Sequence, residues 1–291
     1  MKKQLFVTTF CSLLLAGYGC SSPQANDAVQ DLTQYVDPYI GSGGHGHVFV
    51  GANVPYGLVQ LGPSSIPQEW DWTSGYHISD STVIGFPHMH LSGTGIGDLH
   101  DITLMPVTGE VTYARGVESD QTSGLWSYSD RSKEVVKPGY YATHLLRYNV
   151  DVELTATKRV GFHKYTFNQK ENAAVVFDLQ NGGCWDSPTK AYRNKVDDKT
   201  IEGYRYSSGW ANDQRVFFVA EFSEPITSLD VIVDRGEAVA DKGEGKIVYA
   251  RANVDAQKPV YVKVALSPTS IENAKLNMQT ELPGWDFEGT I

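Results

Sequence analysis

Histidine is concentrated in one short part of this sequence, between positions 45 and 90. His45 and His47 stand two residues apart, and the same spacing recurs at His88 and His90. On an extended chain each pair would face one side, and two such pairs together could ligate a metal ion. The sequence places no carboxylate beside them, so imidazoles that hydrogen-bond a sugar or support the structure fit the spacing equally well.

Two tryptophans alternate with two acids in the segment Glu69–Trp72. On a strand this pattern puts both indoles on one side and both carboxylates on the other. Indole faces cover the apolar faces of sugar rings, and carboxylates accept hydrogen bonds from sugar hydroxyls. The segment therefore indicates an exposed carbohydrate site, although either tryptophan alone could belong to the core.

Glycine-rich loops flank these residues at Gly41–His47 and Leu91–Asp98. Such backbone can approach a ligand or another chain closely. A phosphate-binding loop is excluded at the second segment, because no lysine follows and no strand-to-helix pattern surrounds it. A serine nucleophile elbow is also absent from the sequence, and Cys184 has no histidine beside it, which is typical of an inert buried thiol.

The elements that must hold these loops are strands. Apolar and polar residues alternate over Val150–Thr157, as in a half-buried strand, and continuous apolar runs at Ala173–Phe177 and Val216–Ala220 predict strands that are buried on both faces. Further strands are predicted at Leu229–Val233, Lys246–Ala252 and Pro259–Leu266, and turns at Pro138–Gly139, Asn181–Gly183 and Asp241–Gly245. No helix is predicted between residues 31 and 268. The fold class is therefore all-β, a large antiparallel β-sandwich.

The last part of the chain differs. Thr269 and Glu272 resemble a capping box, and Ile271, Ala274, Met278 and Leu282 follow at helical spacing until Pro283–Gly284. A short C-terminal helix is predicted here. Trp285, Phe287 and the apolar helix face are expected to lack a partner, so we expect the chain to aggregate.

Composition limits the function classes. The chain has 291 residues, enough for one large domain or two ordinary ones. It carries 34 acidic and 24 basic residues, a formal charge of −10, with no cluster of Lys and Arg. Nucleic acid is therefore excluded as a partner. Three cysteines are too few for a disulfide framework.

The N-terminus reads as a secretory signal. Lys2 and Lys3 precede the apolar run Leu5–Ala16, which is too short to span a bilayer. Cys20 follows small residues, as at a bacterial lipoprotein processing site; ordinary signal cleavage nearby, with Cys20 a free thiol, is the alternative. We expect residues 1–19 to be a lipoprotein signal peptide, Cys20 the lipidated residue, and residues 20–31 a flexible tether.

Several motifs together resemble the opening of glycoside hydrolase family 92. They begin with Tyr35–Gly41, Gly44–His47 and Pro55–Leu61, and continue with Ser74–His77 and His88–Gly95. The resemblance spans about residues 33–290 and also includes Gly51–Ala52, Ser79–Asp80, Ile84–Phe86, Leu154–Thr157, Arg159–Gly161 and Ser208–Trp210. Two departures are Ser42, where the family commonly has Thr, and Pro87, where it has a small polar residue.

The resemblance implies a calcium-dependent, exo-acting α-mannosidase that inverts the anomeric centre and trims mannose from N-glycans and mannans. In that family an N-terminal β-sandwich of the galactose-mutarotase type leads through helices into an (α/α) toroid, which supplies most calcium ligands and the catalytic carboxylates. By this resemblance, residues 32–268 are the sandwich and residues 269–291 begin the helical linker to a toroid that this chain lacks. No catalytic residue, calcium ligand or other cofactor is therefore expected in this chain.

The resemblance also suggests which residues face the substrate. We expect Gly44, His45 and Gly46 of the first loop, Trp72 in preference to Trp70, and His88, His90 and Ser92 to contact mannose or to seat the sandwich against the toroid. The chain would then be the substrate-pocket and interdomain part of an exo-α-mannosidase, inactive alone, with a separately encoded toroid half as a conceivable partner.

Two other functions remain open at this point. One is a stand-alone carbohydrate-binding lipoprotein, and the other is a histidine-ligated metalloenzyme unrelated to the family. For the mannosidase part and for the carbohydrate-binding lipoprotein, we expect export through the inner membrane and a lipid anchor in the outer membrane, on its periplasmic or cell-surface face.

Overall fold

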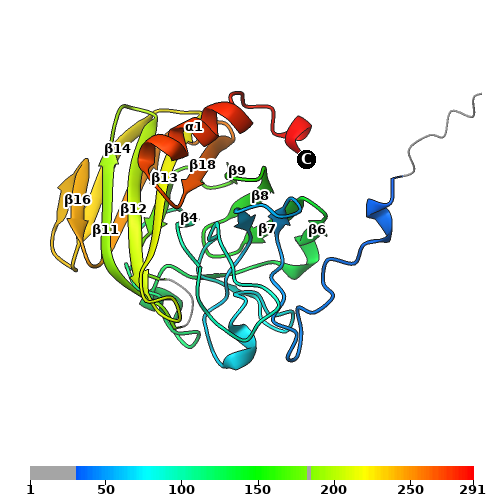
Figure 1. Cartoon of the computed structure of the whole chain (residues 1–291). Helices are drawn as coiled ribbons and strands as arrows, with labels where there is room; N and C mark the ends of the chain where they lie inside the picture. The colour runs from blue at the N-terminus through cyan, green and yellow to red at the C-terminus, as the bar shows by residue number, and fades with distance from the viewer. Residues whose placement is uncertain (1–30, 182–184) are drawn as a thin grey trace, which may run out of the picture. The chain divides into compact units, whose positions relative to one another are not determined.

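Two antiparallel sheets form the body of the protein, as the strand pattern predicts (Figure 1). The computed structural model describes residues 31–181 and 185–291, and residues 35–291 form one compact unit. The larger sheet has nine strands in the order β16-β11-β12-β13-β18-β9-β8-β7-β6, and the smaller has five in the order β15-β14-β17-β10-β4. The all-β sandwich is confirmed.

The strands of the larger sheet are β6 (Val135–Lys137), β7 (Tyr140–Leu145), β8 (Val150–Ala156), β9 (Val160–Phe167), β11 (Ser187–Lys195), β12 (Thr200–Ser208), β13 (Gln214–Phe222), β16 (Lys242–Gly245) and β18 (Val260–Ser267). Those of the smaller sheet are β4 (Thr103–Val107), β10 (Ala174–Asp178), β14 (Ile226–Val233), β15 (Ala238–Ala240) and β17 (Val248–Val254). Two short pairs are β1 (Ala52–Asn53) with β2 (Gln60–Leu61), and β3 (Thr82–Val83) with β5 (Ser127–Tyr128). The 3₁₀ turns are η1 (Thr33–Tyr35), η2 (Trp70–Trp72), η3 (Gln121–Ser123), η4 (Arg131–Lys133) and η5 (Glu288–Thr290).

The core lies between the two sheets. In β8 the apolar residues are buried and the alternating acids Asp151 and Glu153 are only partly so. All five residues of β10 are buried, because this strand lies between β17 and β4. Phe177 of β10 stacks on Phe218 of β13 at a centroid distance of 5.9 Å, which joins the two sheets.

One predicted turn is wrong. Asp241–Gly245 contains the edge strand β16, which pairs with β11 through Ala191↔Gly245 and its neighbours. Its glycines suggested a turn, but they serve packing: a Cβ on Gly243 would meet Val233 of β14 at 2.5 Å. Glycine here allows the edge strand to lie close to the facing sheet.

The predicted C-terminal helix is present as α1 (Ile271–Glu281), and it is the single α-helix among the described residues. Its N-cap is Ser270 rather than Thr269, because the Ser270 hydroxyl accepts the backbone N–H of Asn273. The described residues contain no helix long and apolar enough to cross a membrane.

The C-terminal segment is packed, contrary to the expectation that it lacks a partner. Met278, Leu282 and Phe287 are buried in one cluster with Val160 and Phe162 of β9. The Phe287 ring meets Phe162 edge-on at 5.1 Å. Trp285 is 39% exposed, with the Lys263 ammonium 4.2 Å from its ring centre. The sheet itself therefore covers Met278, Leu282 and Phe287, while Leu276 of the helix stays exposed.

Candidate functional site

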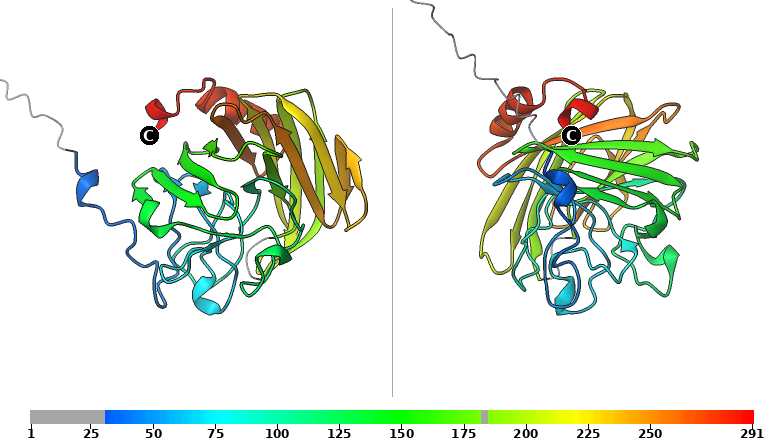
Figure 2. Two further views of the ribbon diagram at one scale, coloured as in Figure 1. Left: turned by 180° about the vertical axis from the view of Figure 1, so that it is seen from behind. Right: turned by 90° about the vertical axis from the view of Figure 1, so that its right-hand side faces the viewer.

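Loops between residues 41 and 101 gather at the end of the sheets away from α1 (Figures 1 and 2). The first is the glycine-rich turn Gly41–His47, in which the backbone N–H of Val48 donates to the carbonyl of Gly41 (3.1 Å). A side chain on Gly46 would collide with that same carbonyl group. Gly44 has φ of +54° and is exposed, as is His45 beside it.

Both histidines of the turn lie beside one carboxylate. Nδ1 of His45 lies 2.6 Å from Oδ1 of Asp71, and Nε2 of His47 lies 3.4 Å from the same oxygen. The hydrogen bond from His45 lowers the pKa of the Asp71 carboxyl. A carboxylate beside these histidines could not be predicted from local spacing, because Asp71 follows His47 by 24 residues.

Residues Glu69–Trp72 do not form the strand that their alternation predicts. Trp70–Trp72 is the 3₁₀ turn η2, so the two indoles separate. Trp72 stacks on His77 at 4.3 Å and its Nε1–H donates to Asp80 (2.7 Å), so this ring is held within the loop. Trp70 is the exposed indole of the pair. The structure thus gives the accessible position to Trp70 rather than to Trp72, which the sequence analysis preferred.

Three exposed tryptophans are tied to the short segment Gly95–Asp98. The Nε1–H of Trp70 donates to the carbonyl of Gly95 (3.0 Å). Glycine is required there, because a Cβ would collide with the indole. The backbone N–H of Trp185 donates to the carbonyl of Gly97 (3.3 Å), and that of Trp210 to Oδ2 of Asp98 (2.7 Å). The exposed fractions of Trp70, Trp185 and Trp210 are 52%, 50% and 72%.

We call His45, His47, Trp70, Asp71 and the segment Gly95–Asp98 the loop cluster. Ser92 joins its two loops: its hydroxyl accepts the backbone N–H of Phe49 (3.1 Å), and the next residue, Gly93, donates to the carbonyl of His47 (2.7 Å). The cluster combines exposed indoles with an imidazole–carboxylate pair, which are the groups that bind sugar rings and their hydroxyls.

His88 lies in the interior, away from the loop cluster surface. Nδ1 of His88 lies 2.5 Å from the carbonyl oxygen of Ile102, so it must carry the proton, and Nε2 of His88 must accept. Nε2 of His163 lies 2.9 Å away and therefore donates, while Nδ1 of His163 accepts the hydroxyl of Tyr165 (2.7 Å). Each ring nitrogen of His88 and His163 therefore has a hydrogen-bond partner, and both rings are neutral. The position of His88 therefore gives no support to the expected contact with sugar.

His90 is also buried. Its Nδ1 lies 2.8 Å from the carbonyl oxygen of Gln60, and its ring lies 4.8 Å from that of His100. Burial lowers the pKa of His88 and of His90 to about 4, and lowers those of His100 and His163 well below their ordinary value. The two His-x-His pairs thus do not converge: the first faces Asp71 and the second lies in the core.

A buried ion network, which sequence patterns did not suggest, lies near the loop cluster. Arg205 of β12 donates to Asp101 (2.5 Å) and to both oxygens of Asp186 (2.8 and 2.9 Å), and all three side chains are almost inaccessible. A buried charge needs such pairing to be tolerated. The network holds Asp186, which directly follows Trp185, and so helps to position the Trp185 indole.

No group of three or more His, Cys, Asp or Glu is arranged to hold a metal ion within residues 31–181 and 185–291. Cys20 and Cys184 lie outside the described residues, as do the predicted signal peptide and most of the tether.

Comparison with known proteins assigns the family. The model of the glycosyl hydrolase family 92 N-terminal domain matches residues 35–267. An uncharacterized secreted glycosidase of Arthroderma benhamiae is 25% identical over 89% of this chain and 36% of its own length.

Solved structures agree with that assignment. A family 92 α-mannosidase of Bacteroides thetaiotaomicron, solved with mannoimidazole, is 34% identical with a TM-score of 0.84, over 89% of this chain and 35% of that one. An inverting family 92 mannosidase of the same organism shares the fold at 20% identity and a TM-score of 0.69, over 86% of this chain and 33% of that one. This chain thus spans about a third of the length of these relatives. The chain belongs to glycosyl hydrolase family 92, and residues 35–267 form the N-terminal domain of that family.

Proposed function

We propose that this chain is the N-terminal domain of an exo-α-mannosidase and that its loop cluster forms one wall of the mannose pocket. The observation that carries the proposal is the exposed Trp70 indole beside the His45–Asp71 pair, both held by glycine-rich turns. The similar Bacteroides structure is that of an α-mannosidase with a bound mannoimidazole. The ring would stack on the indole, and its hydroxyls would bond to the imidazole and the carboxylate.

We further propose that the chain alone does not hydrolyse mannosides. Inverting hydrolysis needs an acid and a base about 6.5–9.5 Å apart on opposite sides of the sugar, and the family resemblance places them in the two thirds of the relatives that this chain does not match. Calcium would act there as well, and hydrolysis would need a toroid half as the partner of this domain. Calcium-dependent release of mannose from high-mannose N-glycan by the purified chain would contradict this.

A single wall should bind sugar weakly, because a concave site supplies most of the buried ligand area. We expect calorimetry with methyl α-mannoside to give a dissociation constant of about 1 mM or weaker. Trp70→Ala should abolish the measurable heat. Trp285→Phe, which alters an exposed indole on the α1 side, is the matched control and should leave the heat unchanged. Equal binding by parent and Trp70→Ala would refute the proposed wall.

The second candidate function is a carbohydrate-binding lipoprotein that acts without a catalytic half. The three exposed indoles tied to Gly95–Asp98 favour it. It requires the isolated chain to hold mannobiose or high-mannose glycan distinctly more tightly than a single mannose. Equal and weak binding of all three ligands would exclude it.

For the location of the protein, we propose export through the inner membrane and a lipid on Cys20 that anchors the chain in the outer membrane. The similar Arthroderma protein is described as secreted, and Lys2, Lys3 and the apolar run before Cys20 match a lipoprotein signal.

A further inference from the structure

A cavity of about 970 Å³ opens between residues of the two sheets, and none of the described loop-cluster residues lines it. Its walls include Tyr249 of β17 and Ser187 of β11, together with Gln180 and Asn181 after β10. Its volume lies within the range of small-molecule sites, about 300–1,000 Å³. It is therefore a candidate site separate from the proposed mannose wall.

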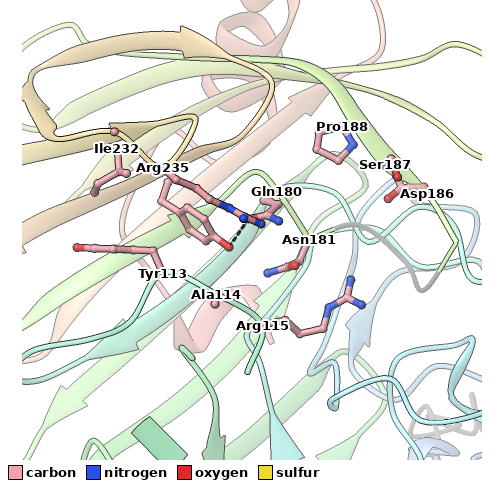
Figure 3. A pocket seen from close by; sticks show the side chains of 12 residues that line it. Tyr113, Ala114, Arg115, Gln180, Asn181, Asp186, Ser187, Pro188, Ile232 and Arg235 are labelled. Atoms are coloured by element: carbon pink, nitrogen blue, oxygen red, sulfur yellow. Dashed lines mark hydrogen bonds between the residues drawn. The ribbon is translucent and has the colours of Figure 1, made fainter. Parts of the chain in front are cut away.

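Two arginines enter this cavity without carboxylate partners. Arg235 and Arg115 approach Gln180 and Asn181 from two sides (Figure 3). In the described part of the chain, the arginines that form ion pairs are Arg131, Arg159, Arg205 and Arg215. Nε of Arg115 is buried and has no hydrogen-bond partner among the described residues. Burial raises the pKa of Tyr249 and the negative charge of Asp178 raises it further, while the positive charges of Arg115 and Arg235 oppose that rise, so both arginine charges act at this hydroxyl.

Two acceptor groups that line the cavity are already occupied. Both carboxylate oxygens of Asp186 receive Arg205, and Oε1 of Gln180 receives the hydroxyl of Tyr249 (2.7 Å). The side-chain amide of Asn181 donates to Asp178, which also receives the backbone N–H groups of Gln180 and Asn181. The cavity consequently offers hydrogen-bond donors and two guanidinium groups, but no free carboxylate on the residues described.

The turn that carries Arg235 is fixed in place. Asp234 and Arg235 have φ of +49° and +63°, a conformation that residues other than glycine rarely adopt. Oδ1 of Asp234 accepts the backbone N–H groups of Lys246 (3.0 Å) and Ile247 (2.8 Å) and so holds the turn against β17. The backbone at Arg235 is thus held in place, and the exposed Arg235 side chain lines the cavity.

We propose that this cavity binds a sugar that carries a carboxylate or a phosphate. Guanidinium groups bind both oxyanions through charge-assisted, frequently bidentate hydrogen bonds. The partly exposed ring of Tyr113 supplies apolar surface for the sugar ring, and the buried ring of Tyr249 packs against it with a centroid distance of 5.5 Å. The chain has a formal charge of −10, so its overall field repels anions and binding must come from this local arrangement.

The test is calorimetry on the purified chain with four probes: glucose 6-phosphate, glucuronate, glucose and inorganic phosphate. Binding of glucose 6-phosphate or glucuronate, at least about tenfold tighter than glucose, supports the proposal, and the preference between these two identifies the oxyanion. Glucose that binds as tightly as the acidic sugars overturns the proposal. A failure of both acidic sugars to bind at a concentration of about 10 mM overturns it as well. Inorganic phosphate that binds as tightly as glucose 6-phosphate overturns the role given to the sugar ring.

Two variants locate the binding. Arg235→Asn removes the charge with a residue that tolerates positive φ, and Arg115→Gln removes the second charge. Each should weaken binding about tenfold or more, because a hydrogen bond to a charged group contributes about 1.5–3 kcal/mol. Arg215→Gln, at an exposed arginine paired with Asp213, is the control and should bind as the parent does. Unchanged affinity in both cavity variants overturns the proposal, and a cooperative urea unfolding transition serves as an independent readout that the variants are folded.

Discussion

The buried histidines predict that the protein loses stability steeply in mild acid. His88, His90, His100 and His163 are neutral in the folded state because burial disfavours the imidazolium. In the unfolded chain each would titrate near 6.5. The unfolded state therefore takes up protons between pH 6.5 and 4 that the folded state refuses, so stability is fully present above 6.5 and falls as the pH is lowered.

The size of the effect follows from the two pKa values. A histidine with a pKa of about 4 folded and 6.5 unfolded costs about 1.8 kcal/mol between pH 7 and pH 5. His88 and His90 together cost about 4 kcal/mol, a large part of the free energy of unfolding of an ordinary domain. His100 and His163 add to the loss in the same direction. Asp101 and Asp178 act in the opposite direction, because burial raises their pKa values and they therefore take up protons at a higher pH in the folded state than in the unfolded state.

Urea unfolding at several pH values between 7 and 5 measures this slope. Near pH 5.5, His88 and His90 each contribute about 1.2 kcal/mol per pH unit. His90→Asn keeps a donor in place of Nδ1 and removes the titrating group, so we expect the slope to fall by about that amount. His45→Asn removes an exposed imidazole and should not reduce the slope. A parent slope below about 1 kcal/mol per pH unit, or an unchanged slope in His90→Asn, would refute the reasoning.

Three further predictions follow from other contacts. Arg193 is fully buried over Phe177 without a hydrogen-bond partner among the described residues, and burial lowers its pKa to about 9. Arg193→Met should therefore stabilise the chain by about 1–4 kcal/mol in urea unfolding. A destabilised variant would show that this guanidinium has an acceptor. Phe287→Ala should cost about 3 kcal/mol because the ring is buried against Phe162, whereas a dangling terminus would show no change in melting temperature. Cys20→Ser should abolish incorporation of radiolabelled palmitate and release the chain from the membrane fraction, and persistent labelling would contradict lipidation at this residue.

The sequence predicted those elements whose pattern reflects the sheet itself. Strand β8 was visible because its alternation matches one buried and one open face, and β10 because it is buried on both. Strand β16 was not, because the glycines that let it approach Val233 are also the residues of turns. The N-cap was predicted one residue too early, because Thr269 and Ser270 are both suitable caps. They are distinguished by the backbone N–H of Asn273, which donates to the Ser270 hydroxyl, while only the side chain of Asn273 donates to Thr269.

The candidate site was predicted less well, because its residues come together through loops. Nothing in the local pattern brings Asp71 to His45, or Trp185 and Trp210 to Gly95–Asp98. The alternation in Glu69–Trp72 has the period of a strand, but the segment adopts a 3₁₀ turn, which exposes Trp70 and encloses Trp72. His88 has the same spacing to its neighbour as His45, yet it serves the core, because a short His-x-His pattern carries no information about burial.

The central claim is that the loop cluster contacts mannose, and NMR on the indole N–H groups tests it most directly. The Nε1–H of Trp70 bonds to the carbonyl of Gly95, so its resonance reports on the cluster, while that of Trp285 reports on the distant α1 side. Titration with methyl α-mannoside should shift the Trp70 signal in a saturable way and leave the Trp285 signal in place. A Trp70 signal that stays unshifted, or that moves no more than the Trp285 signal does, would contradict the account.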